Sequence, residues 1–163
     1  MASMTDSISV QQEKVIDEFS QFDAWDDRYE YLIDLGKALP PLDPRYKTDA
    51  HLVKGCQSRV WLQAEVQDGR LYITADSDTV ITKGIVALLI LVLNGQPVGD
   101  VEQADLDFIE KIGLKSHLSP TRSNGLVSMI QLIKSYARRL GPPVEVAPAT
   151  AAADYREKMI EQI

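Results

Sequence analysis

The fold is decided by residues 60–93, which read VWLQAEVQDGRLYITADSDTVITKGIVALLILVL. In the first half, apolar and polar residues alternate on both sides of Asp68-Gly69, a pair that strongly favours a two-residue hairpin turn. In the second half, an apolar run too long for a strand indicates a buried helix from about residue 79 to residue 93, with Ser77 or Asp78 as its N-cap. The stretch therefore predicts an antiparallel hairpin followed by a core helix.

Apolar residues at helical spacing predict further helices on both sides of this stretch. The expected helices span residues 9–22, 25–39, 102–112 and 120–140. Ser9 is expected to cap the first, and Ser119 followed by Pro120 is a start signal for the last. Residues 42–55 show no clear period and predict mostly loop, with a short strand at residues 51–53. Strands segregated from helices indicate the α+β class, with a small antiparallel sheet packed by helices.

Length and composition indicate one packed domain. The chain has 163 residues, of which 45% are hydrophobic and 25% are charged. We expect this domain to cover residues 1–141. Residues 142–153 are rich in proline and alanine and predict a linker, and residues 154–163 predict a short amphipathic helix.

Charge and cysteine content argue against several classes of function. The formal net charge of -7 opposes binding to nucleic acid or to an anionic membrane. The longest apolar run, residues 85–93, is far shorter than the roughly 20 residues of a membrane-spanning helix. The polar, acidic first residues carry no targeting signal, so a cytoplasmic location is expected. One cysteine and two histidines without ligand spacing predict no bound metal and no iron–sulfur cluster, and the chain has no cofactor-binding motif.

Cys56 is the first candidate for chemistry. It follows Gly55, which permits a tight turn, and its neighbours are polar, as expected for a thiol presented on a loop. Residues 45–59 carry four cations, among them Arg59, against one anion, and such surroundings lower the pKa of a thiol. An inert packing cysteine among solvated loop charges is the alternative interpretation.

Further residues could act together with Cys56. His51 or His117 could form a cysteine–histidine pair if the fold brings one of them close. Arg122 stands in the first turn of the last helix, where the helix dipole disfavours a cation, so a carboxylate is expected to hold it. We predict that this carboxylate is Asp76, at the end of the hairpin.

Three blocks of sequence stand out together. They are GCQSRVW at residues 55–61, ADSD at residues 75–78 with Lys83-Gly84, and HLSPTRSNGL at residues 117–126. Their order and spacing resemble the signature of the SufE/CsdE family of sulfur-acceptor proteins. The segment YLIDLG at residues 31–36 is similar to the second helix of that family, so the resemblance covers roughly residues 12–139.

The resemblance implies a fold like that of the SufE and IscU/NifU proteins and a function in sulfur transfer. Family members take sulfane sulfur from the persulfide of a pyridoxal-phosphate-dependent cysteine desulfurase (SufS/CsdA-like), stimulate its turnover and pass the sulfur to an iron–sulfur scaffold (SufB-like). The protein would be a carrier and activator rather than a stand-alone enzyme. It would need no cofactor of its own, because the pyridoxal phosphate belongs to the partner.

The resemblance also assigns roles to residues by position. Cys56 would carry the persulfide, while Asp76 and Arg122 match family positions near the acceptor loop. The other supporting or partner-binding candidates are loop residues around the cysteine: Gly55, His51 and Arg59.

Two other functions stay open at this point. Cys56 could serve a hydrolase or transferase together with His51 or His117, although the sequence shows no acyl-stabilising motif. The loop could also bind a partner without covalent chemistry. Both a monomer and a homodimer agree with the sequence.

Overall fold

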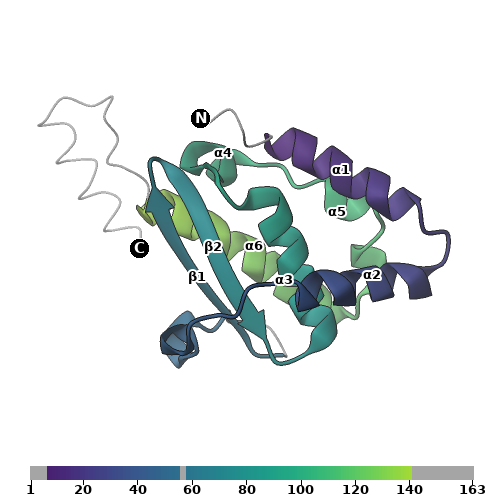
Figure 1. Cartoon of the computed structure of the whole chain (residues 1–163), viewed down its shortest axis with the longest axis horizontal. Helices are drawn as coiled ribbons and strands as arrows, with labels where there is room; N and C mark the ends of the chain where they lie inside the picture. The colour runs from purple at the N-terminus through teal and green to yellow at the C-terminus, as the bar shows by residue number, and fades with distance from the viewer. Residues whose placement is uncertain (1–6, 56–57, 141–163) are drawn as a thin grey trace, which may run out of the picture.

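The structure is a computed structural model that describes residues 7–55 and 58–140. Its sheet begins with strands β1 (Val60–Gln67) and β2 (Arg70–Ser77), which pair antiparallel along their whole length (Figure 1). Asp68 and Gly69 have φ values of 54° and 76°, so both turn residues lie in the left-handed region that a type I′ hairpin turn requires. The predicted hairpin and its turn are confirmed.

A third strand, β3 (Gln96–Pro97), pairs antiparallel with the start of β2 and completes the order β1-β2-β3. It was not predicted, because two residues are too few to show alternation. The Gly95 N–H donates to the Leu71 carbonyl at 2.7 Å, and the Asn94 side chain accepts from the Ile73 N–H at 2.7 Å. The residues that end the preceding helix therefore also fasten it to the sheet.

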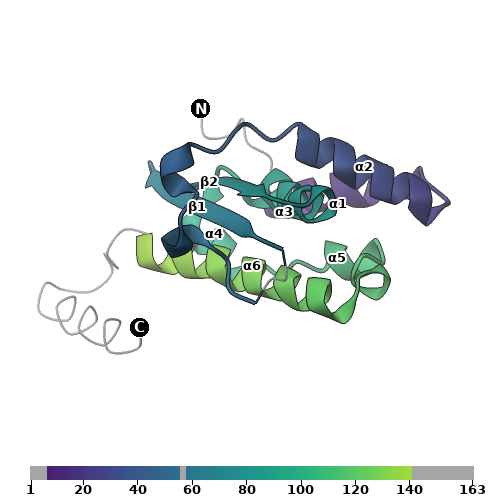
Figure 2. The ribbon, with the colours of Figure 1, turned by 90° about the horizontal axis from the view of Figure 1, so that it is seen from below.

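The core lies between one face of this sheet and the helices behind it. The hairpin residues that face inward are buried, and they are Val60, Leu62, Ala64, Leu71, Ile73 and Ala75. Against them pack α3 (Val80–Leu93), which is buried over most of its length, and α6 (Pro120–Leu140). Figure 2 shows α3 lying between α2 (Trp25–Lys37) on one side and α6 on the other. The α+β class with a small antiparallel sheet is confirmed.

The first helix begins earlier than predicted. α1 (Ile8–Ser20) has Ser7 as its N-cap, whose Oγ accepts a hydrogen bond from the Val10 N–H at 3.2 Å. Ser9 was predicted as the cap but is an exposed helical residue. Because Ile8 is buried, the helix has to begin before Ser9 to place that side chain in the core.

Residues 102–112 form no single helix, in contrast to the prediction. The structure has α4 (Val98–Gln103) and α5 (Phe108–Lys111), separated by an irregular stretch. The buried Gln12 side chain supports this stretch, since its Nε2 donates to the Asp105 carbonyl (3.2 Å) and its Oε1 accepts from the Phe108 N–H (3.1 Å). A partner distant in sequence therefore satisfies the backbone groups that a continuous helix would have satisfied internally.

The segment before the sheet differs from its prediction in one respect. Residues 42–55 contain the 3-10 turns η2 (Pro44–Tyr46) and η3 (Asp49–His51), and no strand forms at residues 51–53. Leu52 makes only an isolated bridge with Trp61, because the chain turns away after a single contact with β1.

Two further sequence predictions concern membrane-spanning helices and the C-terminal residues. Within residues 7–55 and 58–140, no helix combines the length and apolar character needed to span a membrane. The predicted linker at residues 142–153 and the predicted helix at residues 154–163 lie outside the described residues.

Helices α2 and α3 cross with their backbones in contact. A Cβ atom on Gly84 would lie 2.2 Å from the Leu32 carbonyl oxygen, and one on Gly36 would lie 2.9 Å from the Gly84 backbone nitrogen. Both neighbours are helical backbone atoms, which can move only if a whole helix moves. Glycine is therefore required at position 84 for space.

We expect Gly84→Ala to lower the free energy of unfolding by about 3 kcal/mol, because the added methyl overlaps the backbone of α2. The gain in helix propensity, about 1 kcal/mol or less, is too small to offset this overlap. Gly99→Ala in α4 is the matched control, since apart from its chain neighbours and the backbone of its own helix no described atom lies within 4 Å of a Cβ at that position. Urea unfolding of both variants tests the expectation, and equal stabilities would contradict it.

Candidate functional site

Cys56 and Gln57 lie outside the described residues, but both ends of the loop that carries them are described. The Val53 N–H donates to the Val60 carbonyl at 2.8 Å and closes a loop of residues 54–59 at the start of β1. On the first limb, Gly55 has a φ of +89°, and a Cβ there would lie 2.7 Å from the Ser128 Oγ of α6. The positive φ favours glycine at position 55, and a larger residue would also require the Ser128 hydroxyl to move, so the expected tight turn at Gly55 agrees with the structure.

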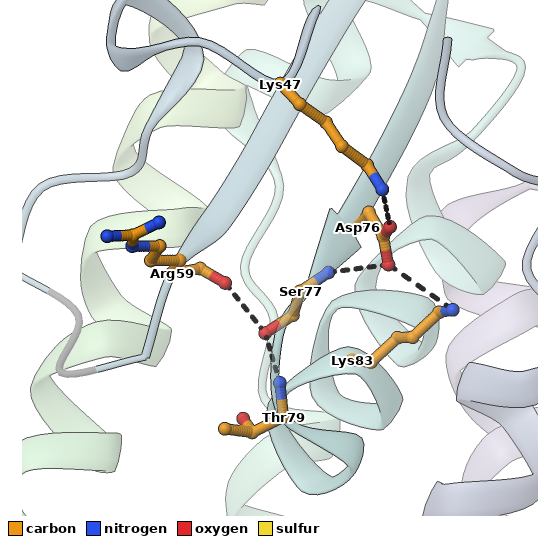
Figure 3. A network of polar contacts seen from close by, with 6 residues as sticks. All are labelled: Lys47, Arg59, Asp76, Ser77, Thr79 and Lys83. Atoms are coloured by element: carbon orange, nitrogen blue, oxygen red, sulfur yellow. Dashed lines mark hydrogen bonds and ion pairs between the residues drawn. The ribbon is translucent and has the colours of Figure 1, made fainter. Parts of the chain in front are cut away.

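The second limb of the loop is bonded to the connection between β2 and α3. The Arg59 N–H donates to Asp78 Oδ1 at 3.0 Å, and the Asp78 N–H donates to the Arg59 carbonyl at 3.1 Å. The Ser77 hydroxyl donates to the same carbonyl at 2.9 Å (Figure 3). The Arg59 guanidinium points away from this network, so its backbone anchors the loop while its charge stays exposed.

These bonds also correct the predicted N-cap of α3. Thr79 is the N-cap residue, rather than Ser77 or Asp78. The Asp78 carboxylate is engaged by the Arg59 N–H, and Ser77 Oγ bonds the Arg59 carbonyl while accepting from the Thr79 N–H at 3.4 Å. Ser77 and Asp78 therefore anchor the loop through Arg59 instead of serving as the N-cap of α3.

Ser58 connects the loop to α3 through its side chain, and sequence reasoning missed it. Its Oγ accepts hydrogen bonds from the Thr79 hydroxyl at 3.0 Å and from the Thr82 hydroxyl at 3.3 Å. The serine also lines a small hollow between α3 and α6, together with Ile85, Arg122, Gly125 and Met129. The signal in the sequence was a buried helix that begins with two threonines, a pattern usually explained by local capping.

Asp76 forms a different ion pair from the one predicted. Its carboxylate lies 2.7 Å from Lys47 Nζ and 3.3 Å from Lys83 Nζ, and it accepts from the Ser77 N–H at 2.8 Å (Figure 3). Partial burial acts to raise the pKa of this carboxyl, but the bonds from Lys47, Ser77 and Lys83 outweigh burial and hold that pKa below its ordinary value. Asp76 thereby ties the segment before the loop to α3.

Arg122 is accordingly not paired with Asp76, and that prediction is wrong. Two lysines from elsewhere in the chain occupy the carboxylate, while the Arg122 side chain is exposed and lines the hollow beside Ser58. Its backbone N–H donates to the Ser119 hydroxyl at 3.2 Å, which confirms Ser119 as a cap of α6. An exposed cation in a first helical turn costs only a fraction of a kcal/mol, so no carboxylate is needed to hold it.

Both histidine rings have local partners. His51 Nδ1 lies 3.1 Å from the Thr48 hydroxyl, and its ring packs against Tyr46. His117, at the end of η4 (Lys115–His117), stacks on Trp25 at 3.8 Å between ring centroids, with its Nδ1 3.0 Å from the Gly113 carbonyl. Neither ring lines the hollow beside Ser58. Within the described ranges, no three His, Cys, Asp or Glu side chains gather closely enough to hold a metal ion.

The fold and the anchored loop define a class of small α+β proteins in which a short loop, here residues 54–59, connects a pair of 3-10 turns to an antiparallel hairpin. A family model described as "SufE: Fe-S metabolism associated domain" matches residues 13–137. The chain belongs to the SufE family, and the resemblance carried by the three sequence blocks is confirmed.

Relatives across bacteria and plants agree with this assignment. An uncharacterised SufE-like protein of Rhizobium meliloti is 41% identical over 130 residues, covering 77% of this chain and 93% of the relative. SufE-like protein 1 of Arabidopsis thaliana, described as chloroplastic/mitochondrial, is 43% identical over 114 residues, covering 69% of this chain and 31% of the plant protein. The solution structure of a hypothetical protein from Thermus thermophilus has a TM-score of 0.68 at 20% identity, covering 80% of this chain and 95% of that one, and this likeness shows the fold alone.

The lowered pKa of Asp76 predicts a pH-dependent contribution to stability. A carboxyl whose pKa is lower in the folded than in the unfolded state stabilises the fold above the ordinary aspartate pKa of 3.8, and this stabilisation is lost as the pH falls through the folded pKa. The free energy of unfolding of Asp76→Asn should therefore be about 1 to 2 kcal/mol lower than that of wild type at pH 7. This difference should shrink below about pH 4.

Asp34→Asn is the matched control for this experiment, because Asp34 is exposed on α2. Denaturant unfolding at several pH values between 3 and 7 measures both variants. A constant difference between Asp76→Asn and wild type over this range would show that the ion pairs do not set the titration of this carboxyl.

Proposed function

We propose that the protein accepts sulfane sulfur on Cys56 from a pyridoxal-phosphate-dependent cysteine desulfurase of the SufS/CsdA type. It stimulates that enzyme and passes the sulfur to a SufB-like iron–sulfur scaffold. The observation that carries the proposal is the SufE family match over residues 13–137, which includes the single cysteine of the chain. The pyridoxal phosphate would belong to the desulfurase, so this chain needs no Schiff-base lysine.

The proposed step is an exchange between two sulfur atoms. The Cys56 thiolate attacks the outer sulfur of the desulfurase Cys–S–SH group, a new S–S bond forms on Cys56 as the old one breaks, and the electron pair leaves on the desulfurase cysteine as a thiolate. One persulfide is consumed and one is formed, so no external oxidant or reductant is required. The reaction requires that this chain provide one accessible thiol, a substantial fraction of which is ionised to the thiolate.

The described residues around the loop support this role. Lys54, Arg59 and Arg122 are exposed cations in or beside the loop, and cations favour a thiolate over a thiol. Val53 and Val60 close the loop at its base, so its ends stay fixed while its middle meets a partner. By contrast, a cysteine–histidine hydrolase would need a histidine beside the cysteine, and both histidines have other contacts.

Incubation with a purified SufS-type desulfurase and L-cysteine is expected to add one sulfur atom to Cys56, and dithiothreitol is expected to remove it. Because the chain has one cysteine, intact-mass spectrometry assigns the added sulfur directly. A wild-type mass that stays unchanged while the desulfurase turns over would refute sulfur acceptance.

Cys56→Ser is the matched control, because a hydroxyl is close in size to a thiol but cannot form a persulfide. This variant is expected to keep its circular dichroism spectrum and to lose both the added sulfur and the stimulation of the desulfurase. Full stimulation by Cys56→Ser in mild reductant would contradict the carrier role and favour a non-covalent interaction module.

We also propose that Arg122 contacts the desulfurase, since its guanidinium is exposed beside the loop and not paired with Asp76. Arg122→Ala should raise the concentration needed for half-maximal stimulation about tenfold, while changing the free energy of unfolding by about 0.5 kcal/mol or less. Arg139→Ala removes the same charge about 25 Å away along α6 and is the control. Equal effects of the two variants would indicate a general charge effect and remove Arg122 from the contact surface.

A further inference from the structure

Charged residues are distributed unevenly over the molecule. Residues 7–39, which include α1 and α2, carry eight acids and three cations, and residues 98–112, which include α4 and α5, carry five acids and one cation. By contrast, residues 45–59 carry four cations and one acid. In Figure 1 and in Figure 2, α1 lies on the opposite side of the molecule from the segment that contains η2 and η3. The loop of residues 54–59 thus belongs to a positive segment of a protein whose net charge is -7.

Two acidic side chains beside this loop are already engaged. Asp76 is paired with Lys47 and Lys83, and Asp78 Oδ1 accepts a hydrogen bond from the Arg59 N–H at 3.0 Å. This bond holds the Asp78 carboxylate at the backbone of Arg59, while the Arg59 guanidinium points away from the network (Figure 3). The charge of the guanidinium is therefore presented to solvent.

Three exposed cations surround the base of the loop, and they are Lys54, Arg59 and Arg122. The first two directly flank the hydrogen bond that closes the loop, and Arg122 lines the hollow beside the second limb. Among residues 7–55 and 58–140, no carboxylate forms an ion pair with any of the three. Like charges gathered in this way create a positive potential that attracts an anionic surface.

The separation of charge also limits how an acidic partner can approach. On an ordinary mixed surface, acids and cations are interspersed. Here most acids of the described residues lie on α1, α2, α4 and α5, or directly beside them. An acidic partner is attracted by the cations around the loop and repelled by these helices, so charge favours the approach in which the loop meets the partner.

We propose that Lys54, Arg59 and Arg122 form a docking surface for an acidic patch on the desulfurase, and that this attraction orients the two proteins before contact. The inference deepens the proposed function and rests on it for the identity of the partner. Association requires no sulfur chemistry, so it can be measured without L-cysteine.

The test is the rate at which the full-length protein associates with an immobilised SufS-type desulfurase, without L-cysteine, between about 50 and 500 mM NaCl. Salt screens the attraction between exposed charges, so the association rate should fall about tenfold over this range. The dissociation rate should change about threefold or less, because charges at the rim of an interface act mainly on the encounter.

Charge reversal at the loop should slow association. Arg59→Glu and Lys54→Glu, on the two limbs, should each lower the association rate at low salt about tenfold and weaken its dependence on salt. Arg59→Lys keeps the charge and should associate within about twofold of the wild-type rate. Arg139→Glu is the matched control, because it makes the same change of charge about 25 Å from Arg122 along α6 and should leave the rate within about twofold of wild type. Circular dichroism of each variant separates a loss of fold from a loss of charge.

Each outcome decides the inference. An association rate that does not depend on salt overturns it, as do equal effects of Arg59→Glu and Arg139→Glu or a complete absence of association. If the variants behave as expected but Cys56 gains no sulfur after L-cysteine is added, the docking surface stands and the proposed sulfur transfer fails. If Cys56 gains sulfur while salt and Arg59→Glu leave the association rate unchanged, sulfur transfer stands and the docking surface fails.

Discussion

The close crossing of α2 and α3 is the constraint on which the rest of the structure depends. Gly36 and Gly84 face each other across this contact, and the Leu32 carbonyl oxygen occupies the space that a Cβ atom on residue 84 would need. This contact fixes α3 in the middle of the fold, between α2 and α6, and α3 then fixes the hairpin that packs on it. Lys83, next to that glycine, reaches Asp76 on β2. The packing of α3 thus helps to set where the second limb of the loop of residues 54–59 lies, because Asp78, just before α3, bonds the Arg59 backbone.

Much of the fold could be predicted because its main elements carry strong local signals. The Asp68-Gly69 turn, the alternation around it, the apolar run of α3 and the Ser119-Pro120 start of α6 each decide a conformation within a few residues. The failures have two physical causes. The break between α4 and α5 depends on Gln12, more than ninety residues away, and β3 is too short to show a pattern. Long-range partners leave no local mark.

The same distinction between local signals and long-range contacts explains which features of the candidate site could be predicted. The prediction of a tight turn at Gly55 followed from a local property, and its φ of +89° agrees with that prediction. The pairing of Asp76 was a guess about a contact between distant segments, and it went to Arg122 because nothing in the sequence shows that Lys47 and Lys83 converge on one carboxylate. Ser58 was missed for the opposite reason. Two threonines at a helix start have an ordinary local explanation, which concealed their contact with the loop.

The hydrogen bond that closes the loop between Val53 and Val60 also limits how far the loop can extend. Six residues held at both ends can project their midpoint about 10 Å from the base at most, even when fully stretched. The contact of Gly55 with Ser128 shortens the free part of the chain further. Any group carried at the tip can therefore enter a neighbouring protein only to a shallow depth. A partner that exchanges atoms with this loop has to hold its own reacting atom near its surface, or bring it outward on a moving segment of its own.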